Sequence, residues 1–231
     1  MRGDGRLEIA AGFATAQGPR PDNQDFGAVD LGSASEEAVQ GIIAAVADGV
    51  GGAMAGRIAA ELGVRSFIDG YRAQNPLIGI AVGATRAVTG FNRWLHDSGR
   101  IDPAMKAAAT TLTAFILRGR EAVVAHVGDS RAWHFRDGVL TLLTQDHVLP
   151  QPDLNHVLYR AVGIEPTLRL DIRSQPLEPH DRLLLATDGV HGVLSSKVLA
   201  RLLGARQSAE ADAAAIVQAA GEAGTPDNAT A

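Results

Sequence analysis

Two apolar stretches of the chain each end in an aspartate followed by a glycine. In residues 41–52 this pair begins at Asp48, and in residues 183–189 it begins at Asp188. Apolar runs of this length predict buried strands, and the glycines predict a sharp turn where each strand ends. A carboxylate at the mouth of a buried strand is unfavourable unless a positive charge meets it. Two strands that end in this way therefore indicate one shared polar site.

Five carboxylates stand at expected strand ends or loop corners beside small neighbours. They are Asp25, Asp48, Asp129, Asp188 and Asp227. Carboxylates that lie close together repel one another, and some would bind protons unless cations neutralise them. Oxygen ligands of this kind suit Mg²⁺ or Mn²⁺, and neither ion needs cysteine or histidine. Two such ions about 3.5–4 Å apart can lower the pKa of a bridging water, which can then attack phosphorus.

An arginine is the natural partner for phosphate oxygens, because its planar fork binds two of them at once. Arg20 lies on the same loop as Asp25 and is the candidate. Each residue also has a plainer interpretation. An Asp-Gly pair after a strand commonly forms only a turn. Asp129 could cap a helix, Asp227 could belong to a terminal loop, and Arg20 could be a solvated surface residue. Spacing alone does not show that these groups lie together.

The hydrophobic pattern predicts the elements that must position these residues. Strands are expected at residues 7–16, 26–31, 41–48, 110–117, 122–127, 132–135, 139–143, 168–172 and 183–186. Long helices are expected at 53–71 and 77–95, short helices near 195–203 and 209–223, and a polar loop at 32–40. Strands at both ends with a helix pair between them argue against alternating βαβ units. They favour antiparallel sheets with helices outside, the two long helices packed as a pair on one sheet.

Composition narrows the classes of protein that fit. The chain has 231 residues, enough for one domain of generous size or two small ones, and 46% are hydrophobic, which argues against disorder. Its net charge is −5 without a basic block, so we expect no nucleic-acid partner. The absence of cysteine excludes disulfides and thiolate metal sites. No apolar run reaches about 18 residues and the N-terminus lacks a signal-peptide core, so we expect a cytoplasmic protein.

Six motifs in a fixed order resemble the metal-dependent Ser/Thr protein phosphatases of type 2C, the PPM family, in their bacterial form. The resemblance runs from about Gly12 to Thr230. The motifs are Arg20-x-x-Asn23-Gln24-Asp25, Asp48-Gly49-Val50-Gly51-Gly52, Gly128-Asp129-Ser130-Arg131, Arg160-Ala161-Val162-Gly163, Asp188-Gly189 and Asp227-Asn228-x-Thr230. This resemblance implies an α+β fold, a four-layer α-β-β-α sandwich of two antiparallel sheets flanked by helices. The metal site would lie at one edge, between the sheets.

The resemblance also implies a role for each site residue. Asp48 would bridge two Mn²⁺ or Mg²⁺ ions, and Asp188, Asp227 and the carbonyl of Gly49 would complete one of them. Asp25 would approach the other ion, largely through water. These four carboxylates are the expected catalytic residues.

Two further assignments follow from the resemblance. Asp129 would help to hold a third, weaker ion together with Asp188, and Arg20 would bind the substrate phosphate.

The chain departs from the family pattern in two places. Val50 stands where animal members carry a histidine proposed as general acid, so leaving-group protonation would fall to water. Only residues 148–159 separate His147 from Arg160, too few for the long mobile flap of bacterial members, so substrate selection is expected to differ. Three histidines near the motifs receive no role from the sequence. They are His147, His156 and His191.

The expected activity is hydrolysis of phosphoserine and phosphothreonine monoesters in one step, by attack of a metal-bridging hydroxide. Expected partners are phosphorylated proteins, namely the substrates of a Ser/Thr kinase or the kinase itself, and we expect a monomer. The alternative is a catalytically idle relative that binds a phosphoprotein as a regulator, against which Arg20 and the five carboxylates count. The motif at 227–230 leads into one more apolar strand in the family. We therefore expect residues 1–231 to form a single catalytic domain, cut from a longer chain just before that strand.

Overall fold

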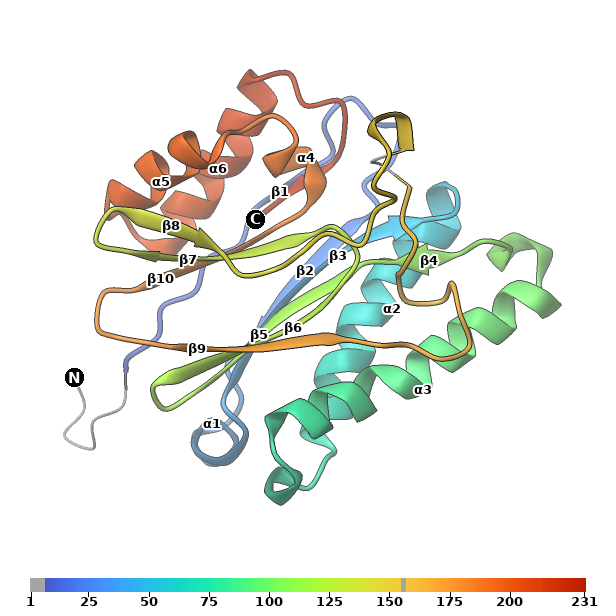
Figure 1. The fold of residues 1–231 in the computed structure, drawn as a ribbon, viewed down its shortest axis with the longest axis horizontal. Helices are drawn as coiled ribbons and strands as arrows, with labels where there is room; N and C mark the ends of the chain where they lie inside the picture. The colour runs from blue at the N-terminus through green and yellow to red at the C-terminus, as the bar shows by residue number, and fades with distance from the viewer. Residues whose placement is uncertain (1–6, 155–156) are drawn as a thin grey trace.

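Two antiparallel β-sheets lie face to face, and helices cover the outer face of each (Figure 1). The structure is a computed structural model that describes residues 7–154 and 157–231. The element order and the layers confirm the four-layer sandwich that the resemblance implies. No helix in the described part of the chain is both long enough and apolar enough to cross a membrane.

The first sheet has the strand order β2-β3-β5-β6-β9, with short β4 beside β3. Its strands are β2 (Asp25–Asp30), β3 (Ile42–Val50), β4 (Ala109–Thr110), β5 (Leu112–Arg118), β6 (Glu121–Val127) and β9 (Asp171–Pro176). Every pairing is antiparallel. The central strands β3, β5 and β6 are buried on both faces, as expected for an inner sheet covered by helices on one side and by a second sheet on the other.

The second sheet has β10 (Arg182–Ala186), β7 (Arg131–Arg136) and β8 (Val139–Leu142) in that order. A short ladder of β1 (Thr15–Ala16) and β11 (Ala229–Thr230) continues this layer. The two parts are joined where the N–H of Thr187, just after β10, donates to the carbonyl of Thr230 at 3.1 Å. Strands β1 and β11, which are far apart in the sequence, therefore meet next to β10, the strand that leads into the second Asp-Gly pair.

Helices α2 (Ala53–Arg72) and α3 (Ile80–Ile101) pack as a pair on the outer face of the first sheet (Figure 1). Phe67, Leu95 and Ile116 lie fully buried in the cluster between them and the sheet. Helices α4 (Asp188–His191), α5 (Ser196–Gly204) and α6 (Ala209–Glu222) cover the second sheet. Short 3₁₀ turns lie at Pro76–Ile78, Pro103–Met105 and Pro152–Leu154.

Four predicted elements differ from the structure. The helix expected at 77–95 is α3, which begins at Ile80 after a 3₁₀ turn and continues to Ile101. Of the strand expected at 7–16, only Thr15–Ala16 pairs as a strand, because its ladder partner β11 is that short. The strand expected at 168–172 is β9 and begins at Asp171, because Leu168 and Leu170 pack instead into the cluster beneath the helix pair. The loop expected at 32–40 contains helix α1 (Ala34–Gln40), which a capping box starts: Ser33 and Glu36 cap each other's backbone N–H groups.

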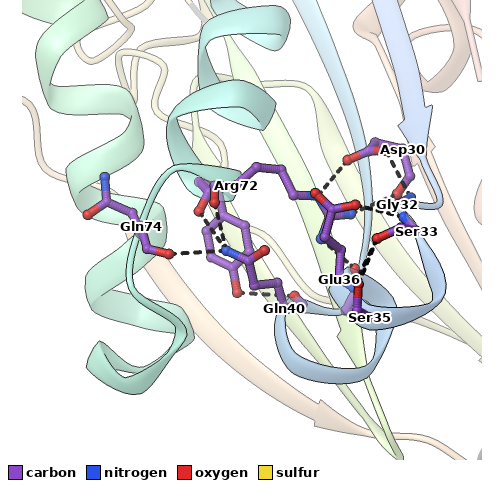
Figure 2. A network of polar contacts seen from close by, with 10 residues as sticks. Asp30, Gly32, Ser33, Ser35, Glu36, Gln40, Arg72 and Gln74 are labelled. Carbon is purple, nitrogen blue, oxygen red and sulfur yellow. Dashed lines mark hydrogen bonds and ion pairs between the residues drawn. The ribbon is translucent and has the colours of Figure 1, made fainter.

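Helix α1 delivers Gln40 to a polar network at the end of β2 and β3 that lies away from Asp25 and Asp48 (Figure 2). The Gln40 side chain donates to the carbonyls of Tyr71, Arg72 and Gln74 at 3.4, 2.9 and 3.1 Å. Arg72 donates through Nε to Asp30 at 2.6 Å and through Nη1 to the carbonyl of Gly41 at 2.9 Å. The network satisfies carbonyl groups at the C-terminal end of α2, which helix geometry leaves without partners.

A cavity of about 780 Å³ lies between the sheets, and none of the predicted site residues lines it. Ala231 and the edge of β10 border it, together with residues 7–13. Ala231 forms reciprocal backbone hydrogen bonds with Ala14, both 2.9 Å, so β11 points toward this space. The expectation of one more strand after residue 231 stays a prediction.

Candidate active site

Asp25 and Asp48 lie directly opposite each other on the neighbouring strands β2 and β3. Directly opposed residues in an antiparallel pair point to the same face with their Cβ atoms about 4.5–5.5 Å apart. Burial, and next the charge of Asp25, hold the pKa of Asp48 well above its usual range. Burial raises the pKa of Asp25 to about 7, although hydrogen bonds from Thr187 and Thr230 oppose the shift. The apolar run correctly placed Asp48 at a strand end, and the sheet register adds Asp25 beside it.

Two threonines fix the backbone of Asp48. The N–H of Asp48 donates to Oγ1 of Thr111 at 2.8 Å, and the hydroxyl of Thr110 donates to the carbonyl of Asp48 at 2.9 Å. Thr111 in turn shares a 2.7 Å hydrogen bond with Ser130, next to Asp129. The sequence motifs assigned these hydroxyls no role. The pair Thr110-Thr111 at the start of a strand is visible in the sequence. Asp48, to which both residues are hydrogen-bonded, lies more than 60 residues earlier in the chain, so the sequence does not reveal the contact.

The two Asp-Gly pairs need glycine because other backbone lies against them. A Cβ on Gly49 would overlap the carbonyl of Gly56, and a Cβ on Gly189 would overlap the carbonyl of Asn228. Gly49 lies against the start of α2, and Gly189 lies against the segment that carries Asp227. Glycine at both positions therefore lets the site be assembled from elements that are distant in sequence.

Asp188 begins helix α4 directly after β10. Burial, followed by the charge of Asp227, raises its pKa. The preceding residue, Thr187, donates its hydroxyl to Oδ2 of Asp25 at 2.7 Å. This bond joins the second sheet to the first at the edge where the carboxylates gather. Asp25, Asp48, Asp188 and Asp227 thus converge from four separate segments.

The loop that carries Arg20 is held in place by Asn228. The Asn228 side chain accepts from the N–H of Gln24 at 2.9 Å and donates to the carbonyls of Gln17 and Asp22 at 2.7 and 2.9 Å. Because Asn228 follows Asp227, the same residue ties the Asp227 corner to this loop. The sequence motif at 227–230 contains Asn228, but only the structure shows that its amide fastens this loop.

Arg20 lies at the rim of the carboxylate group and its side chain is 53% exposed. Its Nη2 contacts Oδ2 of Asp227 at 2.5 Å, and its Nε donates to the carbonyl of Pro226 at 3.2 Å. The structure therefore places Arg20 beside the predicted metal ligands and open to solvent, as a phosphate-binding residue requires.

Asp129 follows β6 at a separate corner of the site. Burial raises the pKa of Asp129 to about 7, and the charges of Asp188 and Asp146 add to the shift. Asp146 is a sixth carboxylate near the site, beyond the five that the sequence singled out. Arg131 holds it in a forked pair, with Nε and Nη2 donating at 2.9 and 2.7 Å. In the sequence, the pattern Thr144-Gln145-Asp146-His147 was the feature that could have pointed to Asp146.

The donor set fits a hard divalent cation. The carboxylates at this edge offer only oxygen, and they raise one another's pKa values, which is the effect expected where a positive charge belongs. Among residues 7–154 and 157–231, no group of three or more His, Asp or Glu side chains is arranged so that it could hold a metal ion. Mg²⁺ in particular keeps several of its waters when it binds a protein, so it needs few direct protein ligands.

The two ends of the segment between His147 and Arg160 lie side by side. Val148 and Leu158 pair across it, and the N–H of Tyr159 donates to the carbonyl of His147 at 2.9 Å. Of the three histidines without a role, His147 and His191 both lie beside the corner at Gly128 and Asp129. The third, His156, lies outside the described residues.

Comparisons with known proteins agree with this geometry. The family model described as protein phosphatase 2C matches residues 22–221. The serine/threonine phosphatase stp of Listeria monocytogenes is 28% identical over 206 residues, which cover 81% of this chain and 82% of that protein. The serine/threonine protein phosphatase PstP of Mycobacterium tuberculosis is 29% identical over 206 residues, 80% of this chain and 38% of that longer protein.

Solved structures show the same fold. The S. agalactiae serine/threonine phosphatase superposes with a TM-score of 0.84 at 27% identity, covering 95% of this chain and 96% of that one. The PPM Ser-Thr phosphatase MsPP from Mycobacterium smegmatis, solved with cacodylate, superposes with a TM-score of 0.79 at 27% identity, covering 96% of each chain. The family model spans most of the chain, and the matched residues 22–221 include Asp25, Asp48, Asp129 and Asp188. The chain therefore belongs to the protein phosphatase 2C family.

Proposed function

We propose that this protein is a metal-dependent Ser/Thr protein phosphatase that hydrolyses phosphoserine and phosphothreonine monoesters. The observation that carries the proposal is the pair Asp25 and Asp48, which face each other at a buried sheet edge with raised pKa values. Family membership and the phosphatases of Listeria and Mycobacterium named above support the reaction class. No observation favours the idle regulator over the enzyme.

The carboxylates would hold the metal ions. Asp48 would contact two Mn²⁺ or Mg²⁺ ions, Asp188 and Asp227 with the Gly49 carbonyl would complete one site, and Asp25 would serve the other. Asp129 would serve a third ion. When bound, such ions lower the pKa of water between them and neutralise phosphate charge. The chain itself supplies rigid placement, through Thr110, Thr111 and Thr187, so that little reorganisation is needed during the reaction.

Arg20 would bind the phosphate of the substrate. Its guanidinium contacts Asp227, and a phosphate dianion would offer it two acceptors at once. Removal of Arg20 is expected to act mainly on KM, because the carboxylates keep their places. The leaving alkoxide would take its proton from water. Val50, which is 43% exposed, stands where animal members of the family carry the histidine proposed as general acid, and valine has no proton to give.

The cellular setting belongs to the proposal as well. The expected substrates are phosphoproteins made by a Ser/Thr kinase, or that kinase itself, in a signalling pathway. We propose that the protein acts as a monomer in the cytoplasm. The segment at residues 148–159 is too short to form the long flap of bacterial family members, so the rim of the site would stay open. Substrates would then be selected by other parts of the surface.

The test is hydrolysis of p-nitrophenyl phosphate and of a panel of phosphoserine and phosphothreonine peptides with added Mn²⁺ or Mg²⁺. We expect turnover that EDTA abolishes and added Mn²⁺ restores. Arg20→Ala and Arg20→Lys report on phosphate binding, with KM raised more than kcat is lowered. A folded wild-type protein that binds phosphopeptides without turnover, at any metal concentration, would establish the idle regulator instead.

A further inference from the structure

The corner that carries Asp129 is held from two sides by histidines. His147 and Gly128 form a reciprocal pair: the N–H of Gly128 donates to Nδ1 of the ring at 3.0 Å, and the N–H of His147 donates to the carbonyl of Gly128 at 2.8 Å. On the other side, Nε2 of His191 lies 3.0 Å from the carbonyl oxygen of Asp129. The two rings come from different elements, the loop after β8 and helix α4.

The hydrogen bonds define which ring nitrogen carries the proton. Nδ1 of His147 accepts from Gly128, so its Nε2 carries the proton and donates to Oδ2 of Asp171 at 3.1 Å. Asp171 also accepts from Nη1 of Arg160 at 2.7 Å. A carbonyl can only accept, so Nε2 of His191 donates to Asp129. Arg160, from the Arg-Ala-x-Gly motif, thus reaches the Gly128 corner through Asp171 and His147.

The His147 ring has little freedom to leave this position. Its side chain is almost fully buried, it stacks on His126 with ring centroids 4.8 Å apart, and the ring of Tyr159 meets it edge-on at 5.7 Å. Burial lowers the pKa of His147, which keeps the ring in the neutral form that accepts from Gly128. The contact is therefore a fixed part of the site at neutral pH.

The corner needs such support. Gly128 adopts a φ of 109°, a conformation that few other residues reach, so the chain turns sharply before Asp129. The charges of Asp188 and Asp146 both repel the Asp129 carboxylate. Glycine makes this turn flexible, and the repulsion pushes the Asp129 carboxylate away from its neighbours. The backbone of the turn must therefore be hydrogen-bonded to neighbouring elements to keep its position.

We propose that His147 and His191 are positioning residues that clamp the Gly128–Asp129 peptide and so keep the Asp129 carboxylate turned toward Asp188. The proposal rests on the proposed function, in which Asp129 serves an outer ion. It assigns a role to two histidines that the reaction itself does not use. Neither ring touches substrate in this scheme, since both act through the backbone of the corner.

Asparagine and glutamine substitutions separate clamping from space filling. The Asn amide oxygen lies near the position of a histidine Nδ1, and the Gln amide nitrogen lies near the position of Nε2. His147→Asn therefore keeps an acceptor for Gly128, whereas His147→Gln loses it. At position 191 the order reverses, because His191→Gln keeps the donor for Asp129 and His191→Asn loses it. The proposal thus predicts opposite rescue patterns at the two sites.

The first readout is amide hydrogen exchange of residues 126–131 in metal-free protein, which is independent of activity. We expect His147→Gln and His191→Asn to speed exchange there about tenfold or more, and the rescuing variants to stay within about threefold of wild type. The second readout is the Mn²⁺ concentration for half-maximal activity. It should rise about tenfold in the two non-rescuing variants, with kcat largely recovered at saturating Mn²⁺.

The control is His134 on β7, which is also buried and lies 2.9 Å from Asp181. His134→Asn and His134→Gln should lower Tm without changing exchange at 126–131. If a His147 variant fails to fold, Asp171→Ala replaces it, since Asp171 is 42% exposed in its side chain and its loss frees Nε2 of His147. Exchange at Gly128 must then rise.

Equal behaviour of the Asn and Gln variants at both positions would overturn the proposal and leave the rings as space-filling residues. Unchanged Gly128 exchange in folded Asp171→Ala would overturn the His147 arm. Absence of any turnover by the wild type would contradict the proposed function, while the exchange pattern would still decide whether the clamp exists.

Discussion

The strands β2 and β3 carry polar groups at both ends, and the two ends are built in opposite ways. At one end Asp25 faces Asp48, and burial together with the charges of neighbouring carboxylates raises the pKa of both carboxyl groups. At the other end Asp30 meets Arg72, and Gln40 satisfies three carbonyls of α2 and the turn after it (Figure 2). The same pair of strands therefore supports one balanced cluster and one cluster with excess negative charge.

The difference shows which end is structural and which is functional. A balanced cluster lowers the free energy of the folded chain, because each buried polar group has a partner. A cluster of like charges raises that free energy, and it persists only where surrounding structure holds it, here through the hydroxyls of Thr111 and Thr187. Divalent cations bound to this cluster would neutralise the like charges and so lower the free energy of the folded chain. Substitutions at the two ends should therefore change stability and activity in different ways.

The largest effect is expected for Asp48→Asn. The change removes the carboxylate assigned to both ions, so kcat/KM should fall by about 100-fold or more at saturating Mn²⁺, which is about 2.7 kcal/mol of transition-state stabilisation. The same change removes a repelling charge, so Tm in EDTA should stay equal or rise. Steady-state kinetics and differential scanning fluorimetry measure both quantities. Activity within about threefold of wild type would show that Asp48 is not the bridging residue.

The metal-free protein should lose stability as pH rises. In the folded chain the pKa of Asp25 and of Asp129 is about 7, above the value of about 4 expected in the unfolded chain. At these two carboxyl groups the folded state therefore binds more protons than the unfolded state between these values, so their contribution to stability is greatest near pH 4 and is lost as pH rises through about 7. Burial lowers the pKa of His126 and of His191 to about 4, and their contribution to stability has the opposite pH dependence below about pH 6.5. The fall due to the carboxyl groups is therefore measured above about pH 6.5. Saturating Mn²⁺ should remove most of this fall, because the ion replaces the protons.

Thermal unfolding in EDTA and in Mn²⁺ across this pH range provides the measurement. The matched control is Asp48→Asn, in which one repelling charge is gone and the metal-free curve should be flatter. A metal-free Tm that rises from pH 7 to pH 8, above the range in which the unfolded histidines titrate, would contradict the raised pKa values of these carboxyl groups.

Arg72→Met should damage the balanced end alone. The side chain of Arg72 is 11% exposed and binds both Asp30 and the carbonyl of Gly41, so its loss should cost about 1–3 kcal/mol of unfolding free energy. For a domain of this size that corresponds to a fall in Tm of about 2–4 °C per kcal/mol. The half-saturating Mn²⁺ concentration and kcat should be unchanged. A shift in either would show that the two ends communicate through β2 and β3.

The local part of the site was predictable from sequence. An apolar run that ends in Asp-Gly indicates a strand end directly, so the residue pattern alone singles out Asp48 and Asp188. The sheet order was not predictable in this way. Asp25 stands opposite Asp48 only because β2 and β3 pair in one register, and a slip of one residue would turn it to the other face.

The supporting groups were hidden for the same reason. Thr187 and Asp25 are 162 residues apart, and no local pattern announces their hydrogen bond. Helix α1 is a different case, since Ser33 and Glu36 carry the spacing of a capping box and the polar composition of the segment obscured it. Recognition of that spacing would have predicted the helix, although not the contact of Gln40 with α2.

The smallest expected effect compares the two ends of a single strand by the same chemical change. Asp25→Asn and Asp30→Asn each replace a β2 carboxylate by an amide of equal shape. Asp25→Asn should raise Tm in EDTA near pH 8, because it removes a buried charge that its neighbours repel while its oxygen still accepts from Thr187. Asp30→Asn should lower the free energy of unfolding by about 1 kcal/mol or less, and so lower Tm slightly, because it weakens a half-buried pair with Arg72. Differential scanning fluorimetry of both variants at about pH 4 and pH 8 separates the causes, since the gain in Tm at Asp25 must vanish near pH 4, where its carboxyl group is already protonated.

Changes in Tm of opposite sign at pH 8 would confirm that carboxylates repel one another at one end of β2, whereas a carboxylate is paired with a positive charge at the other. Equal signs would mean that β2 responds to the loss of a carboxylate in the same way at both ends, and the contrast between the clusters would fail.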